Sequence, residues 1–301
     1  MPQQNKTGYL LEDFRIFYNA DRNMRTIPLH YHDFHKIVIL LSGHVSYMIE
    51  GRTFDLLPGD LVLVRAGAMH QPVIHDSTLY ERIIIYIAPD FSCSDLSGRP
   101  GGSEESVTAA ALFKKALPGF ELIRPEGQDA QELGSIFSSL KRSSLEKDPQ
   151  RQVFAQLYRR IKTIELMILL LRLLSRDLSV SPRTSSASPM AADIMSYISR
   201  NLTDPALCVD RIAEANNLNR SYLMHYFKEQ TGYTIGNYIT EKRLFIARSL
   251  ISQGTSMTQA CYECGFGSYS AFYRAYRKKY GLSPKERNPD RRTLAASDHA
   301  E

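Results

Sequence analysis

The sequence predicts an α+β protein of several domains: an antiparallel β-barrel or double-sheet roll, then helices, then an all-α domain with two helix-turn-helix motifs. Two observations predict this class. Residues 24–91 hold short runs rich in Ile, Val and Tyr that end at turn residues, as in antiparallel barrels. Residues 207–284 hold one helical pattern twice. A chain of 301 residues, 43% of them apolar, is long enough for two globular domains.

Five strands are expected in the N-terminal region. Each is an apolar run that ends at Gly, Pro, Ser or other residues that favour turns. The expected strands are residues 36–41, 45–49, 53–57, 61–65 and 82–87. A barrel built from such strands can enclose a cavity for a small molecule.

Helical periodicity follows a loop rich in Ser, Gly and Pro at residues 92–103. Helices are expected at residues 104–117, 130–145 and 150–176. The last helix has an apolar stripe that is too wide for a solvated helix, so it packs on the barrel, on a second subunit, or on both. The stripe consists of Val153, Leu157, Ile161, Ile164, Ile168 and Leu171.

These patterns also set the expected domain boundaries. Residues 180–189 are rich in Ser and Pro, a composition typical of a flexible linker, and the C-terminal end is polar. The expected parts are a barrel domain at residues 1–103, a helical coupling and dimerisation region at 104–178, a linker at 179–189, a helical domain at 190–288 and a disordered tail at 289–301.

The helical pattern recurs with an offset of 48 residues at the turn and 49 residues after it. Asn217 and Gly265 lie at the two turns. Both residue types tolerate the left-handed conformation that lets a chain leave one helix and enter the next. Two equivalent helix-turn-helix motifs are therefore expected.

The second helix of each motif has an inward face and an outward face at helical spacing. The expected inward residues are Tyr222, Leu223, Tyr226 and Phe227 in the first copy and Ala271, Phe272, Ala275 and Tyr276 in the second. The outward faces carry hydroxyl, aromatic and basic side chains, which suit the base edges and phosphates of a major groove. The expected DNA-binding residues are Asn219, Arg220, Ser221, Met224, His225, Lys228, Ser268, Tyr269, Ser270, Tyr273, Arg274 and Arg277.

Amphipathic helices in an ordinary all-α domain are the simpler alternative for either copy taken singly. The repetition of the pattern in register favours DNA binding. The distribution of charge agrees with this interpretation. Residues 190–301 carry 15 Lys and Arg against 11 Asp and Glu, so most of the net charge of +5 belongs to the half that would bind phosphates.

Residues 190–288 resemble the DNA-binding domain of the AraC/XylS family of bacterial transcription regulators, including the linking helix around residues 238–250. The resemblance implies that this helix holds two recognition helices about one turn of DNA apart, so that one subunit reads two successive major grooves. The sequence departs from the family at Asn217, where Gly is usual, at Arg220, where Pro is usual, and at residues 261–264, where Ala and Val types are usual.

The N-terminal region is similar to the cupin-like sensor domain of the same family. The similarity lies in His30-Tyr31-His32, the Gly43 turn, Leu57-Pro58-Gly59-Asp60 and Ala68-Met69-His70. In metal-binding cupins a Glu follows the paired histidines, but Lys36 stands at that position here, and a charged ammonium has no lone pair for a metal. We therefore expect no metal and no other cofactor.

A small polar effector, of which a sugar is one candidate, is expected to form hydrogen bonds inside the barrel. Two alternatives remain open: a three-histidine metal site with His35 or His75 nearby, and histidines that only satisfy backbone groups at the mouth of the barrel. The expected effector-binding residues are His30, His32, Tyr47, His70, Tyr80 and Arg82.

Four cysteines, Cys93, Cys208, Cys261 and Cys264, fit a reducing compartment better than a disulfide framework. Cys261 and Cys264 have zinc or redox spacing, but no second pair follows, so a role in the core is expected. The N-terminus lacks the pattern of a signal peptide. The most apolar run, residues 164–174, is interrupted by charges and is too short to span a bilayer, so a cytoplasmic protein is expected.

The expected function is that of a one-component transcription regulator and not of an enzyme. A small ligand enters the barrel, changes how the DNA-reading domains of a homodimer are disposed, and so alters transcription. The expected partners are double-stranded operator DNA, the effector and a second copy of the chain, with RNA polymerase as a further candidate and no membrane. Two alternatives remain: a metal-dependent cupin enzyme fused to a DNA-binding domain, and a ligand-independent DNA-binding protein.

Overall fold

The computed structural model describes residue 10 and residues 12–22, 27–92, 107–115, 121–146, 148–175 and 189–281. The chain divides into two compact units, Met1–Ile49 with Thr53–Ser186 and Glu50–Arg52 with Ala187–Glu301. Cys93, the expected tail at 289–301 and nearly all of the expected linker at 179–189 lie outside the described residues.

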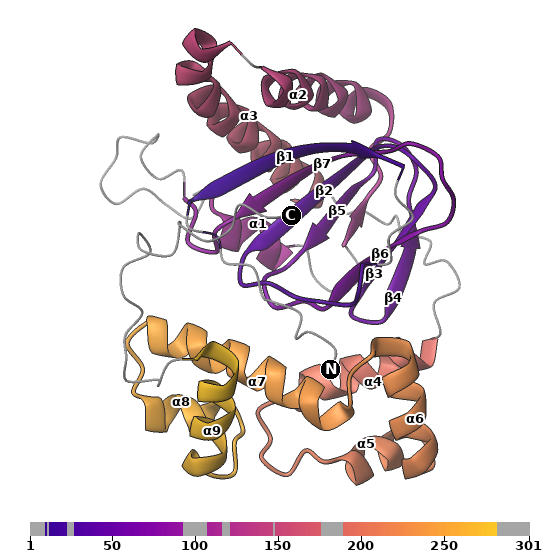
Figure 1. Cartoon of the computed structure of the whole chain (residues 1–301), viewed down its shortest axis with the longest axis vertical. Coiled ribbons are helices and arrows are strands. Elements are labelled where there is room, and N and C mark those ends of the chain that lie inside the picture. The colour runs from indigo at the N-terminus through magenta and orange to yellow at the C-terminus, as the bar shows by residue number, and fades with distance from the viewer. Residues whose placement is uncertain are drawn as a thin grey trace. The chain divides into compact units, whose positions relative to one another are not determined.

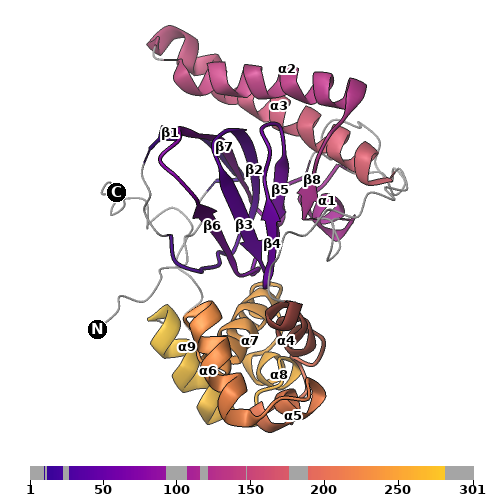
Figure 2. The ribbon, with the colours of Figure 1, turned by 90° about the vertical axis from the view of Figure 1, so that its right-hand side faces the viewer.

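Two antiparallel sheets form the framework of the first unit (Figures 1 and 2). The larger sheet has the order β1 (Phe14–Asp21), β7 (Tyr80–Ile87), β2 (His35–Ser42), β5 (Leu61–Val64) and β8 (Leu122–Ile123). The smaller sheet has the order β4 (Arg52–Asp55), β3 (Val45–Ile49) and β6 (His70–Ile74). The expected antiparallel double-sheet class is confirmed.

Three strands were not expected from the sequence. β1 precedes the region of the predicted strands, and it pairs with β7 so that Phe14 lies opposite Ile87. β6 contains Pro72, which argues against a strand in a sequence. Proline is tolerated here because β6 is an edge strand, with Pro72 opposite Tyr47 of β3. β8 has two residues, too few to show a period.

Alternation along β2 directs its side chains to two different cores. Ile37 and Ile39 join the core that the larger sheet forms with the helices, whereas Val38 and Leu40 join the core shared with the smaller sheet. The helices are α1 (Ala109–Lys115), α2 (Gly127–Leu145) and α3 (Pro149–Ser175), and α2 and α3 cover one face of the larger sheet (Figure 1). Side chains on the other face of β2 therefore point towards the smaller sheet.

The sheet-facing side of α3 differs from the stripe that periodicity predicts. Leu166, Met167, Leu170 and Leu173 are buried against the core. By contrast, three members of the expected stripe are exposed, namely Leu157 at 58%, Ile161 at 53% and Ile168 at 46%. Ile164 and Leu171 are partly buried at the core's edge, and the side chain of Val153 lies outside the described residues.

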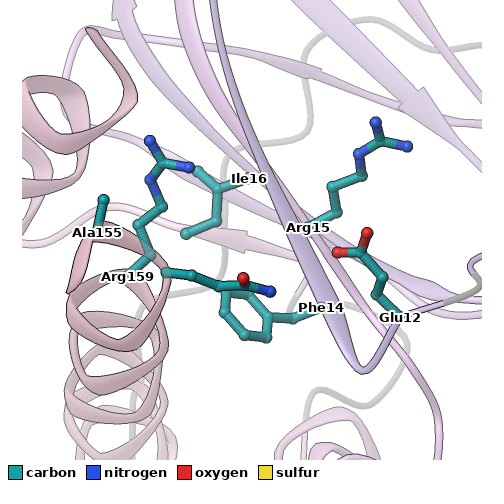
Figure 3. Close-up of a pocket in the computed structure, with 7 residues that line it drawn as sticks. Glu12, Phe14, Arg15, Ile16, Ala155 and Arg159 are labelled. Atoms are coloured by element: carbon teal, nitrogen blue, oxygen red, sulfur yellow. The ribbon is translucent and has the colours of Figure 1, made fainter. Parts of the chain in front are cut away.

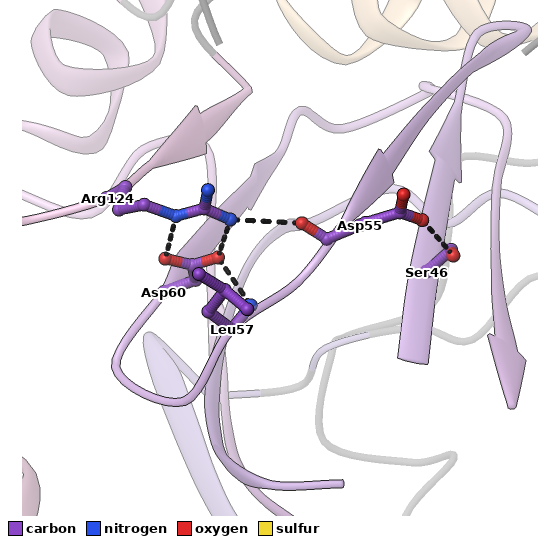
Figure 4. A network of polar contacts seen from close by, with 5 residues as sticks. All are labelled: Ser46, Asp55, Leu57, Asp60 and Arg124. Carbon is purple, nitrogen blue, oxygen red and sulfur yellow. Dashed lines mark hydrogen bonds and ion pairs between the residues drawn. The ribbon is translucent and has the colours of Figure 1, made fainter. Parts of the chain in front are cut away.

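An ion pair between the exposed Arg124 and the buried Asp60 fastens β8 to the turn before β5 (Figure 4). Arg124 donates to both carboxylate oxygens of Asp60, at 2.9 and 2.6 Å, and to the backbone carbonyl of Asp55 at 3.0 Å. Asp60 is 1% exposed and also accepts from the backbone N–H of Leu57. The sequence Leu57-Pro58-Gly59-Asp60 thus has a structural role, because a buried carboxylate is tolerated only when it is paired and hydrogen-bonded.

The described part of the second unit is helical (Figure 1). Its elements are α4 (Pro189–Arg200), α5 (Val209–Ala215), α6 (Arg220–Thr231), α7 (Ile235–Ser252), α8 (Met257–Glu263) and α9 (Tyr269–Tyr280). Cys261 and Cys264 are buried in a core with Leu244 and Phe272, as expected for core residues. Among the described residues, no helix is long and apolar enough to cross a membrane.

Candidate DNA-binding helices and ligand-binding cluster

The first helix-turn-helix motif consists of α5 and α6, joined at Asn217. The φ angle of Asn217 is +53°, which confirms the left-handed turn. The side chain of Asn219 caps α6 by accepting from the N–H of Ser221 at 2.8 Å, and Gly232, with φ +74°, is the C-cap that follows the end of α6 at Thr231. Capping by Asn and a left-handed Gly are the signals by which a sequence begins and ends a helix.

The second motif consists of α8 and α9, joined at Gly265 with φ +83°. A Cβ atom at this position would lie 2.7 Å from the carbonyl oxygen of Thr203 and 2.9 Å from that of Leu202. Ser268 caps α9 by accepting from the N–H of Ala271 at 3.2 Å. Two independent constraints therefore favour glycine at position 265: the left-handed backbone conformation and the closely packed neighbouring atoms.

The inward faces of the recognition helices are narrower than the sequence predicted. Leu223, Phe227, Phe272 and Tyr276 are buried. However, Tyr222 is 51% exposed and stacks on Tyr226, with ring centroids 5.9 Å apart, and Ala271 is exposed as well, so both are corrected to the outward side. Each lies one residue before a buried position, and one residue turns a helix by about 100°.

The expected DNA-binding side chains are accessible. Tyr269 and Tyr273 are half-buried, and the other ten are exposed. Arg220, which replaces the usual proline, donates to Asp210 of α5 at 2.5 Å, and this carboxylate raises the pKa of its guanidinium. Asn219 and Ser268 use their side-chain oxygens as helix caps, so these oxygens are already occupied.

The linking helix α7 is packed against both motifs. In the first motif, Tyr238 meets Phe227 edge to face, with ring centroids 5.3 Å apart. Arg243 is 8% exposed and donates to the carbonyl oxygens of Leu202 at 2.8 Å and Asp204 at 2.7 Å. Farther along α7, Leu244 and Ala247 belong to the core of the second motif. One rigid helix thus positions both recognition helices.

In the first unit, three of the expected effector-binding residues form a cluster of histidines. His30 and His70 pair through their backbones, with hydrogen bonds of 3.1 and 2.8 Å, so their side chains emerge side by side. The rings of His30 and His32 lie 4.3 and 4.7 Å from that of His70, measured between centroids. Tyr47 stacks on His70 at 6.0 Å. We call His30, His32, His70, Tyr47 and the adjacent Lys36 the histidine cluster.

The tautomers of the three histidines follow from their hydrogen bonds. Each Nδ1 atom lies 2.7 to 3.0 Å from a backbone carbonyl oxygen, of Pro28, Phe34 and Ala68 respectively. A carbonyl oxygen can only accept, so each Nδ1 carries the proton. Burial, assisted by the charge of Lys36, lowers the pKa of all three imidazoles. Their Nε2 atoms are therefore acceptors at neutral pH.

Lys36 is a functional candidate that the sequence indicated only as a departure from a metal-binding pattern. Its Nζ atom lies 3.5 Å from Nε2 of His70 and 5.7 Å from the centroid of the Tyr47 ring. Burial, and then the charge of Arg82, lowers the pKa of Lys36 to about 7. The alternation of β2 could have revealed its place, because Lys36 has the same parity as Val38 and Leu40, which face the smaller sheet.

The remaining expected effector residues lie next to the cluster. Arg82 is close enough for its charge to lower the pKa of Lys36, but it is already paired with Asp21 at 2.8 Å and lies over the Tyr80 ring at 4.0 Å. His35 and His75 do not join the cluster. His35 stacks on Phe113 of α1 at 4.0 Å, and His75 hydrogen-bonds to Ser46 at 2.5 Å.

The histidine cluster does not fit a metal ion. The lone pair of His70 Nε2 faces the Nζ atom of Lys36, a positively charged group when protonated, at 3.5 Å. Among the described residues, no group of three or more His, Cys, Asp or Glu side chains is arranged to hold a metal ion. The chemistry of the cluster's side chains is hydrogen bonding, by the imidazole nitrogens and the Tyr47 hydroxyl, and charge pairing, by Lys36 when it is protonated.

A separate pocket of about 400 Å³ lies between β1 and α3 (Figure 3). Phe14 and Ile16 of β1 and Ala155 and Arg159 of α3 line it, and Figure 3 shows the Arg159 side chain beside them. The Nε atom of Arg159 is buried, and within the described residues it has no hydrogen-bond partner. This pocket is next to the exposed side of α3 and does not include the histidine cluster.

Comparisons with known proteins agree on both units. A model of the AraC-like ligand binding domain matches residues 13–174, and a model of a helix-turn-helix domain matches residues 212–287. The transcriptional activator RhaS of Citrobacter koseri is 25% identical over 275 residues, which cover 86% of each chain. The RhaS activator of Escherichia coli O6:H1 is 25% identical over 276 residues, again covering 86% of each chain.

Two solved structures are also similar to this chain. A single-residue variant of apo ToxT from Vibrio cholerae has a TM-score of 0.36 and 14% identity, covering 94% of this chain and 98% of its own. The DNA-binding domain of AdpA, solved with a target DNA, has a TM-score of 0.30 and 23% identity, covering 32% of this chain and 86% of its own. Since the ligand-binding model alone matches more than half of the 301 residues, the chain belongs to the AraC family of transcription regulators, with an N-terminal ligand-binding domain and a C-terminal helix-turn-helix domain that binds DNA.

Proposed function

We propose that a homodimer of this chain binds operator DNA through α6 and α9, and that a small polar effector bound at the histidine cluster alters this binding. The cluster carries the proposal. His32 Nε2 and the Tyr47 hydroxyl are buried and, among the described residues, have no hydrogen-bond partner. A buried polar group without a partner costs about 1–3 kcal/mol, so a ligand that satisfies both atoms gains affinity from this cost.

Within each recognition helix, side chains at different positions contact different parts of the DNA. The outward side of α9 carries Arg274, whose planar guanidinium can donate two hydrogen bonds to a guanine edge. Arg277 and, in α6, Lys228 lie nearer the C-terminal ends of their helices and suit phosphates. Because α7 packs against both motifs, the two helices are held at a fixed separation, which suits two successive major grooves.

The exposed side of α3 is proposed as the dimer contact. Phe154, Leu157 and Ile161 are 72%, 58% and 53% exposed, and Tyr158 and Ile168 extend the same apolar surface. A second copy of the chain would cover this surface symmetrically, as in most homodimers. RNA polymerase is a further candidate partner of a regulator bound at a promoter.

The effector proposal can be tested with the full chain. An operator is first selected from random DNA by binding, and polar metabolites are then screened for those that raise the melting temperature, because a ligand of the folded state stabilises it. A hit should change operator affinity in the wild type, but not in His32→Ala or Tyr47→Phe. His44→Ala is the matched control, because His44 is exposed and lies outside the cluster. An effector response that survives both cluster variants would contradict the proposed site.

The dimer contact has a separate test. Ile161→Glu should shift the sedimentation of the full chain towards the monomer, because a charge would be buried without a partner at the contact. Leu57→Glu is the control, since Leu57 is also 53% exposed but lies in the turn before β5. An unchanged mass for Ile161→Glu would rule out this surface.

A further inference from the structure

The histidine cluster combines hydrogen-bond acceptors with a buried lysine, whose amine is cationic when protonated, and this combination restricts the chemistry of the effector. Lys36 is 7% exposed, and its neighbours include the Nε2 atom of His70 and the ring of Tyr47. Within the described residues, no carboxylate forms an ion pair with it. Burial lowers the pKa of Lys36 to about 7, so the side chain readily loses its proton when it has no partner, and an anionic ligand beside it would keep it charged.

The acceptors are set by the fold. Because the Nδ1 atom of His32 donates to the carbonyl of Phe34 at 2.7 Å, its Nε2 atom can only accept while the ring is neutral. This Nε2 atom is buried and lacks a partner within the described residues. His30 has the same tautomer, through Pro28. A ligand that satisfies these nitrogens must donate hydrogen bonds, and a carboxylate oxygen does not.

The donors complete the set. The Tyr47 hydroxyl is buried without a hydrogen-bond partner among the described residues, and burial raises its pKa, so it keeps its proton and can donate. Lys36 uses one N–H towards His70 and has others available. Arg82 is a weaker candidate, because Asp21 already neutralises its charge.

We propose that the effector is a small hydroxycarboxylate, such as an α-hydroxy acid or a sugar acid. Its carboxylate accepts from Lys36 and Tyr47, and its hydroxyl groups donate to the Nε2 atoms of His32 and His30. This inference rests on the proposed effector role of the histidine cluster and specifies the class of ligand. A neutral sugar would offer Lys36 no negative charge to pair with, and a carboxylate without hydroxyl groups would leave the imidazole acceptors unsatisfied.

The test uses the full chain and a panel of matched compounds. The hydroxycarboxylates are lactate, malate, gluconate and galacturonate. Sorbitol and galactose are the neutral counterparts of gluconate and galacturonate, and propionate and succinate are the hydroxyl-free counterparts of lactate and malate. Thermal shift and calorimetry should show binding of at least one hydroxycarboxylate, and binding at least about tenfold weaker for its matched counterpart, the effect of leaving one buried partner unsatisfied.

Variants assign the binding to the proposed atoms. Lys36→Met keeps the length of the side chain and removes the charge, so it should weaken hydroxycarboxylate binding at least about tenfold while the chain stays folded. Tyr47→Phe should weaken binding of the acid, and His44→Ala should leave it unchanged. Lys36→Met is suitable because replacing a buried charge by an apolar group of similar volume is often neutral or stabilising.

Each other outcome overturns the inference. Binding of a neutral sugar with no binding of any acid would refute the hydroxycarboxylate while leaving the effector role of the cluster intact. Equal binding of an acid by Lys36→Met and the wild type would place the carboxylate elsewhere. A stoichiometric metal whose removal abolishes binding would show that the histidines are ligands. A different result would refute the proposed function itself: compounds would bind the cluster, but none of them would change the affinity of the protein for its operator.

Discussion

The two helix-turn-helix motifs make the same turn in different surroundings. At the first turn, Asn217 is exposed and only its φ angle of +53° restricts it. At the second turn, Gly265 is buried, and an added Cβ would lie 2.7 Å from the carbonyl oxygen of Thr203. A shared motif therefore does not imply shared tolerance to substitution. The left-handed backbone conformation favours Gly or Asn at both turns, whereas packing excludes a side chain only at the second turn.

The largest expected effect comes from giving both turns the same side chain. Gly265→Ala should reduce the free energy of unfolding by about 2–4 kcal/mol, because the Cβ overlaps backbone atoms and φ is unfavourable. Asn217→Ala should cost about 1 kcal/mol, because only the left-handed conformation is penalised. Calorimetric melting of the two full-length variants checks the difference. Equal losses would mean that the loop at Thr203 moves aside.

A somewhat smaller loss is expected at Arg243, which fastens the loop before α5 to α7. Arg243→Met should cost about 2–3 kcal/mol, since the buried carbonyl oxygen of Leu202 and the part-buried one of Asp204 lose a charged donor. Arg211→Met is the control, because Arg211 pairs with Asp204 at 2.7 Å on the surface, where an ion pair contributes about 0–1 kcal/mol. Denaturant unfolding of both variants makes the comparison. A loss at Arg211 as large as at Arg243 would contradict it.

The two motifs should also differ in how strongly they discriminate between DNA sequences. Arg274→Ala should cost about 1–3 kcal/mol on the selected operator and much less on random DNA, because a bidentate contact with a guanine is lost. Its counterpart His225 has fewer donors, so His225→Ala should relax specificity less. Titration of both DNAs with both variants measures this. Equal weakening of operator and random DNA by Arg274→Ala would show that Arg274 does not read bases.

The smallest effect is expected at the phosphate contacts. Arg277→Ala and Lys228→Ala should weaken binding to all sequences alike, and each should flatten the slope of log affinity against log salt by about one unit. Titrations at several salt concentrations check this. An unchanged slope for either variant would remove that side chain from the phosphate contacts.

Local signals in the sequence predicted much of this molecule. The strand at Val45–Ile49 and the left-handed turns at Asn217 and Gly265 follow from short-range patterns, and the structure confirms them. The edge strand containing Pro72 was missed, because proline argues against a strand unless the order of strands is known. Whether a strand lies at the edge or in the middle of its sheet depends on tertiary structure, and a local sequence pattern does not show it.

The candidate sites show the same limit. The grouping of His30, His32 and His70 was predicted only from the resemblance to a known family. The position of Lys36 in the cluster could not be predicted without knowing which face of β2 meets the smaller sheet. On α3, periodicity found an apolar stripe but could not tell that Leu166 and Leu170 face the sheet while Ile161 and Ile168 stay exposed. When apolar residues surround most of a helix, the sequence alone does not show which side of the helix faces the core.

The loop at residues 202–204 touches both halves of the DNA-binding unit, and this has a consequence for how the unit unfolds. The carbonyl oxygen of Leu202 accepts from Arg243 of α7 and also lies beside Gly265 of the second motif. Opening either half therefore disturbs contacts of the other, which joins the two motifs into one cooperative segment. Amide hydrogens of α6 and α9 should consequently exchange with solvent at matched rates, as those of two independent helical hairpins would not.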